Sequence, residues 1–345
     1  MFYAAASLSG AFSGLLAYAI EQMDGVAGLG GWQWVSESSD NGACVSNTPQ
    51  IFILEGLIPV ALSLIIWKIL PDSPETASFL TAREKEYIIN RLALDTGSGA
   101  GKVTNNDKIT MRHILDAFKQ YQIYGAVVMF WANTIGVYGF TATVPSVIQD
   151  LGYSSANAQL LTIPIYLAAM IVVLIFAFWS ERVQQRTPFI MAGYSIAVLG
   201  FIGQLAIPQT RLPGLTYGFL FPVAIGLYSP FIQIVCLTAN NLAPSSKRAV
   251  GMAILISIGN FGGIAGSNIF IKDQAPKYPV GFGTGLTICC LAIIMAFLLR
   301  IAYRNENKKK RELLEREGEE AVRARYTDQE LLDLGDKSPF FMYTL

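Results

Sequence analysis

The feature that most constrains this chain is a series of apolar runs long enough to cross a lipid bilayer. A spanning helix needs roughly 20 mostly apolar residues, and eight stretches qualify, most of them without any charged residue. Because a charge at the bilayer centre costs about 2.5–3.5 kcal/mol on insertion scales, charge-free runs of this length are typical of membrane spans. The runs cover about residues 3–20, 51–70, 121–142, 158–179, 187–207, 215–238, 249–271 and 282–303.

Composition supports the same class of protein. Hydrophobic residues make up 52% of the chain and charged residues only 14%, against about 25% charged in ordinary globular domains. The alternative, a soluble protein with buried helices, explains one or two of the runs but not eight. The chain carries 25 basic and 25 acidic residues, which argues against nucleic-acid binding through bulk positive charge.

The sequence offers no set of residues for an enzyme active site. It contains one His, and three of its four Cys lie inside apolar runs. A membrane-embedded enzyme needs a metal site or a nucleophile cluster at one depth, and these residues do not supply one. We therefore expect no catalytic activity, no metal and no cofactor.

Basic residues predict how the chain is oriented in the membrane. Most Lys and Arg residues fall in the stretches 71–118, 180–186 and 239–248 and in the tail from residue 304, whereas the opposite loops hold only three. Because cytosolic loops are enriched in Lys and Arg, this side should face the cytosol, which places both termini inside.

The spans predict four regions along the chain. Residues 1–70 hold two spans, 71–118 form a polar cytosolic loop, 119–304 form a six-helix bundle, and 305–345 form a cytosolic tail. Thr81 to Glu84 has the pattern of a capping box and predicts a short helix behind it. Within the tail, residues 312–325 predict a surface helix of mixed charge, exposed to solvent.

Several short motifs, taken in order, resemble one family of fungal transporters. They are Ala6-Ser7-Leu8-Ser9-Gly10-Ala11-Phe12-Ser13-Gly14-Leu15-Leu16-Ala17-Tyr18, Met23-Asp24-Gly25, Gly31-Trp32-Gln33-Trp34, Ile51-Phe52-Ile53-Leu54-Glu55-Gly56, Leu70-Pro71-Asp72-Ser73-Pro74-Glu75-Thr76 and Leu334-Gly335-Asp336-Lys337-Ser338-Pro339. In this order they are similar to the fungal allantoate permease family, the anion:cation symporter branch of the major facilitator superfamily. The resemblance implies an all-α integral membrane protein with the major facilitator fold, in which this chain supplies about eight helices. These are the last two spans of the N-terminal bundle and a complete six-helix C-terminal bundle.

The chain departs from the family in two places. Members of the family have twelve spans, so this chain is expected to be truncated at its amino end, without the first four. In the family, the Gly-Trp-x-Trp motif runs directly into Ile-Phe-Ile-Leu-Glu-Gly, whereas here Val35–Gln50 intervene. Codons for these residues can contain fungal splice signals, so we interpret 35–50 as a translated retained intron. The alternative is a genuine insertion in an outer loop.

Polar side chains near the middle of the spans are the candidate substrate-binding residues, because transporters bind substrate near the bilayer midplane. The amides offer both donors and acceptors, and the tyrosines offer a hydroxyl and a flat ring for a planar substrate. The alternative role for each is a hydrogen bond between helices. The candidates are Asn133, Tyr138, Tyr166, Tyr228, Gln233 and Asn260.

Charged residues suggest a gate and a possible proton relay. Ser180 to Arg186 resembles the acidic-basic cytosolic loop of the superfamily, which makes Glu181, Arg182 and Arg186 candidate gating residues; the positive-inside bias explains the two Arg equally well. Glu55 is a candidate proton relay, or simply a polar residue at the outer end of its span. No charged residue lies at mid-depth in the last six spans, so groups that bind protons or anions would come mainly from the absent spans.

The resemblance implies a secondary transporter working by alternating access, with protons as the coupling ion. Its substrate would be a small organic anion such as allantoate, nicotinate or a related carboxylate. The expected setting is a monomer in the plasma membrane, and the chain as written is expected to be inactive. The alternative function is a non-transporting membrane sensor, or a partner of a full-length transporter, which binds cytosolic regulators through its tail.

Overall fold

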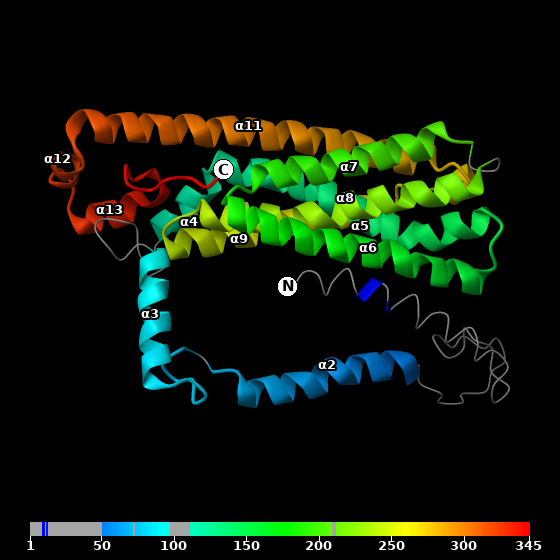
Figure 1. Cartoon of the computed structure of the whole chain (residues 1–345), viewed down its shortest axis with the longest axis horizontal. Coiled ribbons are helices and arrows are strands. Elements are labelled where there is room, and N and C mark those ends of the chain that lie inside the picture. The colour runs from blue at the N-terminus through cyan, green and yellow to red at the C-terminus, as the bar shows by residue number, and fades with distance from the viewer. Residues whose placement is uncertain (1–8, 11, 13–49, 72, 97–110, 209–211) are drawn as a thin grey trace.

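The computed structural model describes residues 9–10, 12, 50–71, 73–96, 111–208 and 212–345, and every regular element in these ranges is a helix. Six helical segments are long and apolar enough to cross a membrane, and they run side by side in one bundle (Figure 1). This confirms that the six predicted runs between residues 121 and 303 form helices long and apolar enough to span a membrane. The segments are α5 (Tyr121–Asp150), α6 (Ser155–Val183), α7 (Thr187–Ala206), α8 (Pro213–Asn240), α9 (Ser245–Asn260) continued by α10 (Gly262–Gly266), and α11 (Pro279–Glu317).

The first two predicted spans stay predictions. The run at 3–20 falls outside the described residues except for Ser9, Gly10 and Phe12. The run at 51–70 corresponds to α2 (Gln50–Ile69), which contains a shorter apolar helix over Pro59–Ile69. The proposed intron segment 35–50 also lies outside the described residues, apart from the backbone of Gln50 at the start of α2.

The outer surface of the bundle is apolar, as a lipid-facing surface must be. Large hydrophobic side chains on three different helices point outward, including Ile171 on α6, Leu199 on α7 and Phe297 on α11, and each is at least half exposed. A water-soluble protein rarely exposes apolar area on this scale. The backbone polar groups are satisfied within the helices, which is the condition for crossing hydrocarbon.

The interior is held by close helix contacts. α7 packs against both α8 and α11, and α5 packs against α8, α9, α10 and α11. A Cβ on Gly226 of α8 would lie 2.2 Å from the backbone nitrogen of Ala197 on α7, so only glycine permits this approach. The fully buried Tyr194 ties the same region to α5, because its hydroxyl donates to the carbonyl of Met129 at 2.6 Å.

The predicted span 249–271 corresponds to the helical segment Ser245–Gly266, which has a local irregularity at Phe261. α9 ends at Asn260 and α10 begins at Gly262. Side chains of α5 bond two carbonyls at this irregularity: the Trp131 indole N–H donates to Ile258 at 2.9 Å and the Thr134 hydroxyl donates to Gly259 at 2.9 Å. An irregularity at membrane depth is tolerated where neighbouring groups satisfy the freed backbone.

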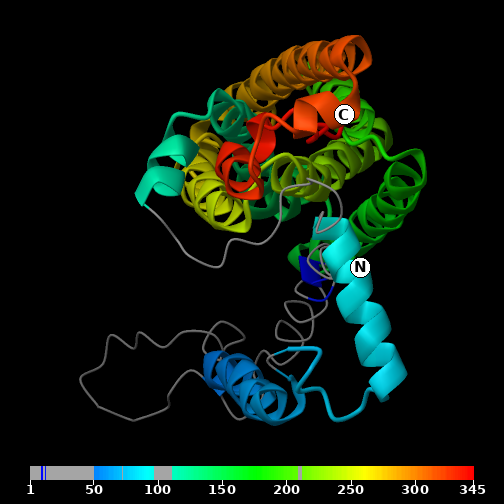
Figure 2. The same cartoon turned by 90° about the vertical axis from the view of Figure 1, so that its left-hand side faces the viewer.

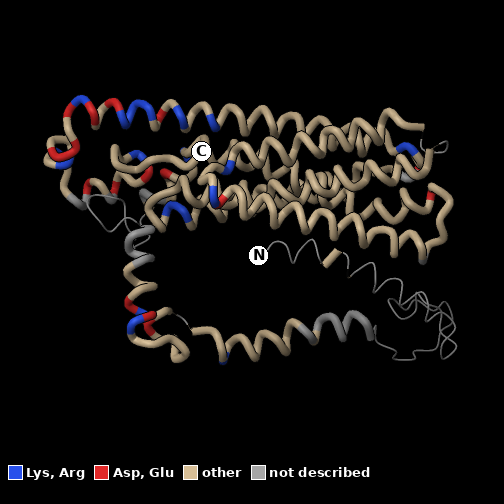
Figure 3. The backbone as a smooth tube through the Cα atoms, viewed as in Figure 1, with Lys and Arg blue, Asp and Glu red and all other residues tan. Residues whose placement is uncertain are grey.

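Charged residues gather at one end of the bundle, here called the charged end (Figure 3). This end carries the α6–α7 loop, the α8–α9 loop and the chain beyond residue 303. The short helix α4 (Met111–Phe118) packs there against α9, and α3 (Ala82–Thr96) stands beside the same end (Figure 2). α3 begins with the predicted capping box, since the Thr81 N–H donates to the Glu84 carboxylate at 2.9 Å and the Glu84 N–H to the Thr81 hydroxyl at 3.4 Å.

The tail differs from the prediction in its helix. The predicted surface helix 312–325 is divided, because α11 continues from the last span to Glu317, and Gly318, with φ +80°, separates it from α12 (Glu319–Arg323). After α13 (Asp328–Leu334), the chain returns to the bundle. Asp336 and Ser338 are fully buried there.

Candidate functional site

A cavity of about 600 Å³ opens between α5, α8 and α9. Asn133, at its wall, lies 12 residues from the start of α5 and 17 from the end, and Tyr228 lies 15 and 12 residues from the ends of α8. The cavity is therefore at mid-depth in the bundle, where transporters bind their substrates. Its lining residues are Ser9, Gly10, Asn133, Thr134, Val137, Tyr138, Thr141, Ala142, Tyr228, Phe231 and Asn260.

The structure brings four of the six candidate residues together at this cavity: Asn133, Tyr138, Tyr228 and Asn260. Tyr166 lies directly behind, with its buried ring set edge-on to Tyr228 at 6.0 Å between centroids. A Cβ on Gly10 would lie 3.2 Å from the Tyr166 ring, so the described part of the first predicted span also approaches this site.

Gln233 belongs to a different part of the molecule. It is almost fully buried, at 1% exposed, and its side-chain carbonyl accepts a hydrogen bond from the Arg186 guanidinium at 3.4 Å. The side chain thus joins the α6–α7 loop at the charged end. It lies only five residues beyond Tyr228 on α8, but it is not among the residues that line the cavity.

Asn133 makes the kind of interhelical bond that the sequence left open as its alternative role. Its side-chain amide donates to the carbonyl of Leu227 on α8 at 2.6 Å, and the residue is 3% exposed. Pro230 lacks the N–H that would bond the carbonyl of Gly226 in the preceding turn, so Asn133 supports α8 beside a weakened turn. The same residue lines the cavity, which makes a structural role and a ligand-contact role compatible.

Thr141 is a site residue that the sequence analysis missed. Its hydroxyl lies 3.2 Å from the Tyr228 hydroxyl and faces the cavity. The residue sits seven positions after Thr134 and three after Tyr138, and these spacings place all three on one face of α5. That spacing is the signal that could have found it.

The cavity wall is polar but uncharged. Its described lining residues supply amide and hydroxyl groups with three aromatic rings, those of Tyr138, Tyr228 and Phe231, and they include no Asp, Glu, Lys or Arg. Such a wall suits a small planar ligand that is held by hydrogen bonds and ring contacts. Among the described residues, no group of three or more His, Cys, Asp or Glu is placed to hold a metal ion.

The candidate gating residues form a network around Arg186. This residue is buried, pairs with the Glu181 carboxylate, and donates to the Ser180 hydroxyl at 2.7 Å. Arg182 lies apart from this network, with its guanidinium 4.8 Å from the centre of the Phe178 ring.

Arg300 of α11 supports the same loop, and sequence reasoning did not single it out. Its guanidinium donates to Thr187 at 3.1 Å and to Gln185 at 3.0 Å. The loop between α6 and α7 is thus fastened to α11 as well as to α8. The other charged candidate, Glu55, occupies a position in α2, and its side chain lies outside the described residues.

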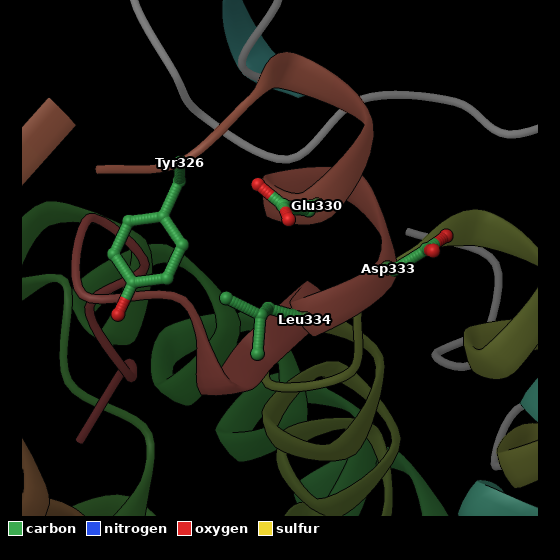
Figure 4. Close-up of a pocket in the computed structure, with 4 residues that line it drawn as sticks. All are labelled: Tyr326, Glu330, Asp333 and Leu334. Carbon is green, nitrogen blue, oxygen red and sulfur yellow. The ribbon is translucent and has the colours of Figure 1, made fainter. Parts of the chain in front are cut away.

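A smaller hollow of about 270 Å³ lies on α13 at the charged end (Figure 4). It is lined by Tyr326, Glu330, Asp333 and Leu334. The Glu330 carboxylate is already engaged in capping α13, since it accepts hydrogen bonds from the Thr327 N–H at 2.8 Å and from the Thr327 hydroxyl at 3.0 Å. The mid-depth cavity is therefore the stronger candidate for a ligand site.

Comparison with known proteins agrees with this geometry. The family model described as Major Facilitator Superfamily matches residues 1–267. The chain is 30% identical to the MFS-type transporter cnsO of Penicillium expansum, across 100% of this chain and 64% of that protein. It is 26% identical to the high-affinity nicotinic acid transporter of Saccharomyces cerevisiae, across 99% of this chain and 58% of that protein. It is also 24% identical to the major facilitator-type transporter hxnP of Emericella nidulans, across 99% of this chain and 63% of that protein.

The chain thus spans less than two thirds of the length of these relatives. All three are named as transporters, and the family match extends from residue 1 into the last third of the chain. Together with the six apolar helices packed as one bundle, these matches show that the chain belongs to the major facilitator superfamily of membrane transporters.

Proposed function

We propose that the chain forms the larger part of a secondary transporter for a small organic anion, working by alternating access. The observation that carries the proposal is the uncharged, mid-depth cavity with amide, hydroxyl and aromatic groups on its wall. A planar carboxylate such as nicotinate fits this chemistry, because its ring can contact Tyr228 and Phe231 while its polar atoms bond to Asn133 and Asn260. Allantoate and related carboxylates remain alternative substrates.

The charge of the anion must be balanced elsewhere, since the described cavity wall supplies only neutral donors. We propose that protons accompany the substrate and that the groups which bind them face the cavity from the other half of the transporter. Glu55 stays our candidate proton relay on the first half. The similarity to the nicotinic acid transporter supports a carboxylate substrate and the fungal allantoate permease branch, at 26% identity.

The proposal includes the arrangement of the chain in the membrane. We place the charged end in the cytosol because Lys and Arg accumulate there, with both termini on that side and the protein as a monomer in the plasma membrane. Residues 1–70 then belong to the N-terminal bundle, 71–118 to the cytosolic interdomain loop, 119–304 to the C-terminal bundle and 305–345 to the tail.

Uptake of radiolabelled nicotinate and allantoate tests the proposal in two arms. We expect cells that express the 345 residues alone to show no saturable uptake. A chimera that joins this chain behind the part of the Saccharomyces nicotinic acid transporter which it does not match should restore uptake, competed by unlabelled carboxylates. A chimera that reaches the membrane in normal amounts and transports none of these anions would refute the proposed substrate class.

A further inference from the structure

Residues 335–345, here called the tail segment, return to the charged end of the bundle and bury the Asp336 carboxylate. One oxygen of Asp336 accepts from the Lys247 ammonium at 2.5 Å. The other accepts from the Gln120 side-chain amide at 2.7 Å and from the Tyr343 hydroxyl at 3.2 Å. The carboxylate thus joins the start of α9, the residue before α5 and the tail segment itself.

Two asparagines hold the last residues of the tail segment by paired backbone bonds. Asn307 of α11 donates to the Tyr343 carbonyl at 2.8 Å and accepts from the Tyr343 N–H at 2.8 Å. Asn241, at the end of α8, does the same with Thr344, at 2.9 Å and 2.7 Å. Each side-chain amide therefore makes the paired donor and acceptor bonds that a neighbouring β-strand would make to an extended segment.

A lysine and a backbone amide complete the attachment. The Lys310 ammonium donates to the carbonyls of Asp336 at 2.7 Å and Phe341 at 2.8 Å, and it lies 4.4 Å from the centre of the Tyr343 ring. The backbone N–H of Arg186, the central residue of the gating loop, donates to the Leu345 oxygen at 2.5 Å.

The charged side chains that hold the tail segment are buried. The Lys247 side chain is 5% exposed and that of Asp336 is 0% exposed. Charges taken out of water are tolerated only when they are paired and their remaining hydrogen bonds are made. Burial and the nearby Asp336 charge also raise the pKa of the Tyr343 phenol, so that its hydroxyl stays a donor to the carboxylate.

We propose that the tail segment is a strap that fastens the charged ends of α5, α7, α8, α9 and α11 into one unit, with the Lys247–Asp336 pair as its catch. The strap holds the gating loop through Arg186, so its release also frees the α7 end of that loop. This inference rests on contacts within the chain and needs no assumption about which substrate is carried.

Thiol labelling of the purified full chain tests the strap. Cys44, Cys236 and Cys290 are replaced by Ser, which keeps Cys289, a fully buried core residue, as an internal reporter of global opening. Ser338→Cys then places a second thiol inside the strap, at a position that is 0% exposed. A parallel chain with Met342→Cys, at a 36% exposed position of the same segment, gives the rate for an accessible thiol.

We expect the thiol at position 338 to react with maleimide far more slowly than the thiol at position 342. Asp336→Asn or Lys247→Met should each raise the rate at position 338 about 100-fold, equivalent to about 3 kcal/mol at roughly 1.4 kcal/mol per tenfold, while the rate at Cys289 stays low. Combining Lys247→Met with Asp336→Leu should return the rate to within about tenfold of the parent, because no unpaired charge is then buried.

Two control variants separate release of the strap from general damage. Lys337→Gln changes an exposed charge next to the catch and should leave the rate unchanged. Lys247→Arg keeps the charge and should restore most of the protection that Lys247→Met loses. The proposal is overturned if position 338 is as reactive as position 342 in the parent chain, if the single variants leave its rate unchanged, or if positions 338 and 289 always become reactive together.

Discussion

The sharpest prediction concerns two asparagines that line the same cavity but make different bonds. Asn133 reaches another helix, donating to the Leu227 carbonyl at 2.6 Å, and is buried. Asn260 is exposed and, within the part of the chain that the structure describes, bonds the Ile256 carbonyl of its own helix at 2.9 Å. Asn133→Ala therefore leaves a buried carbonyl on α8 without its side-chain donor, whereas Asn260→Ala removes a bond that does not join helices.

The expected cost follows from the setting of each bond. Hydrogen bonds between membrane helices contribute about 0.6 kcal/mol on average and up to about 1.7 kcal/mol, and the Leu227 carbonyl still faces the N–H of Phe231 in its own helix when the side-chain donor is lost. Since the Asn133 bond is short and buried, we expect Asn133→Ala to lower the free energy of unfolding by about 1–2 kcal/mol. Asn260→Ala should change it by less than about 0.5 kcal/mol.

Equilibrium unfolding of the detergent-purified chain, followed by the exposure of Cys289, measures both values. Asn133→Ser is a useful third variant, because its hydroxyl is too short to span the same gap and should behave like Asn133→Ala. The reasoning fails if Asn133→Ala is as stable as the parent, or if Asn260→Ala is destabilised as much as Asn133→Ala. Equal losses would mean that the cavity wall, and not the interhelical bond, determines the stability.

Three further outcomes are expected. Tyr228→Phe removes a hydroxyl 3.2 Å from that of Thr141 and should cost about 0.5–1.5 kcal/mol of stability, and the chimera that carries this change should bind nicotinate with weaker affinity. Gly226→Ala places a methyl group against Ala197 and should cost about 1–3 kcal/mol through overpacking, measured by the same unfolding assay. The capping bonds of α3 lower the pKa of Glu84 below its usual 4.5, so its contribution is present above that pH and is lost as pH falls through the lowered value. Amide exchange in the first turn of α3 measures that loss.

The bundle could be predicted because lipid imposes a simple rule on sequence. Runs of about 20 residues with little or no charge have few other uses, and all six between residues 121 and 303 form helices of spanning length. The ends were harder to predict, because a helix does not stop where lipid stops. α11 continues through polar sequence to Glu317, and only Gly318 ends it.

The candidate site was predicted in part. Asn133, Tyr138, Tyr228 and Asn260 meet at one cavity, as their shared depth suggested, and Gln233 lies toward the gating loop. Depth along a helix can be counted from sequence, but the direction in which a side chain points depends on neighbours that the sequence does not specify. Whether these residues contact substrate stays a prediction.

The attachment of the tail segment to the bundle could not be predicted from the local sequence pattern. Lys247 and Asp336 are 89 positions apart, and each lies in a polar stretch whose composition predicts exposure to solvent. Mixed charge usually marks a solvated surface. Here the bundle supplies enough partners to bury the pair, and only the folded arrangement reveals it.

Ligand protection at the mid-depth cavity tests the central claim most directly. In the chimera described above, with Cys289 as its only remaining cysteine, Asn260→Cys places a thiol on the cavity wall, and Ser195→Cys places one on the exposed face of α7 as a control. We expect nicotinate or allantoate to slow alkylation at position 260 saturably and to leave position 195 unaffected, with choline having no effect at either. Equal alkylation rates at position 260 with and without saturating concentrations of these anions would contradict the assignment of this cavity as the substrate site.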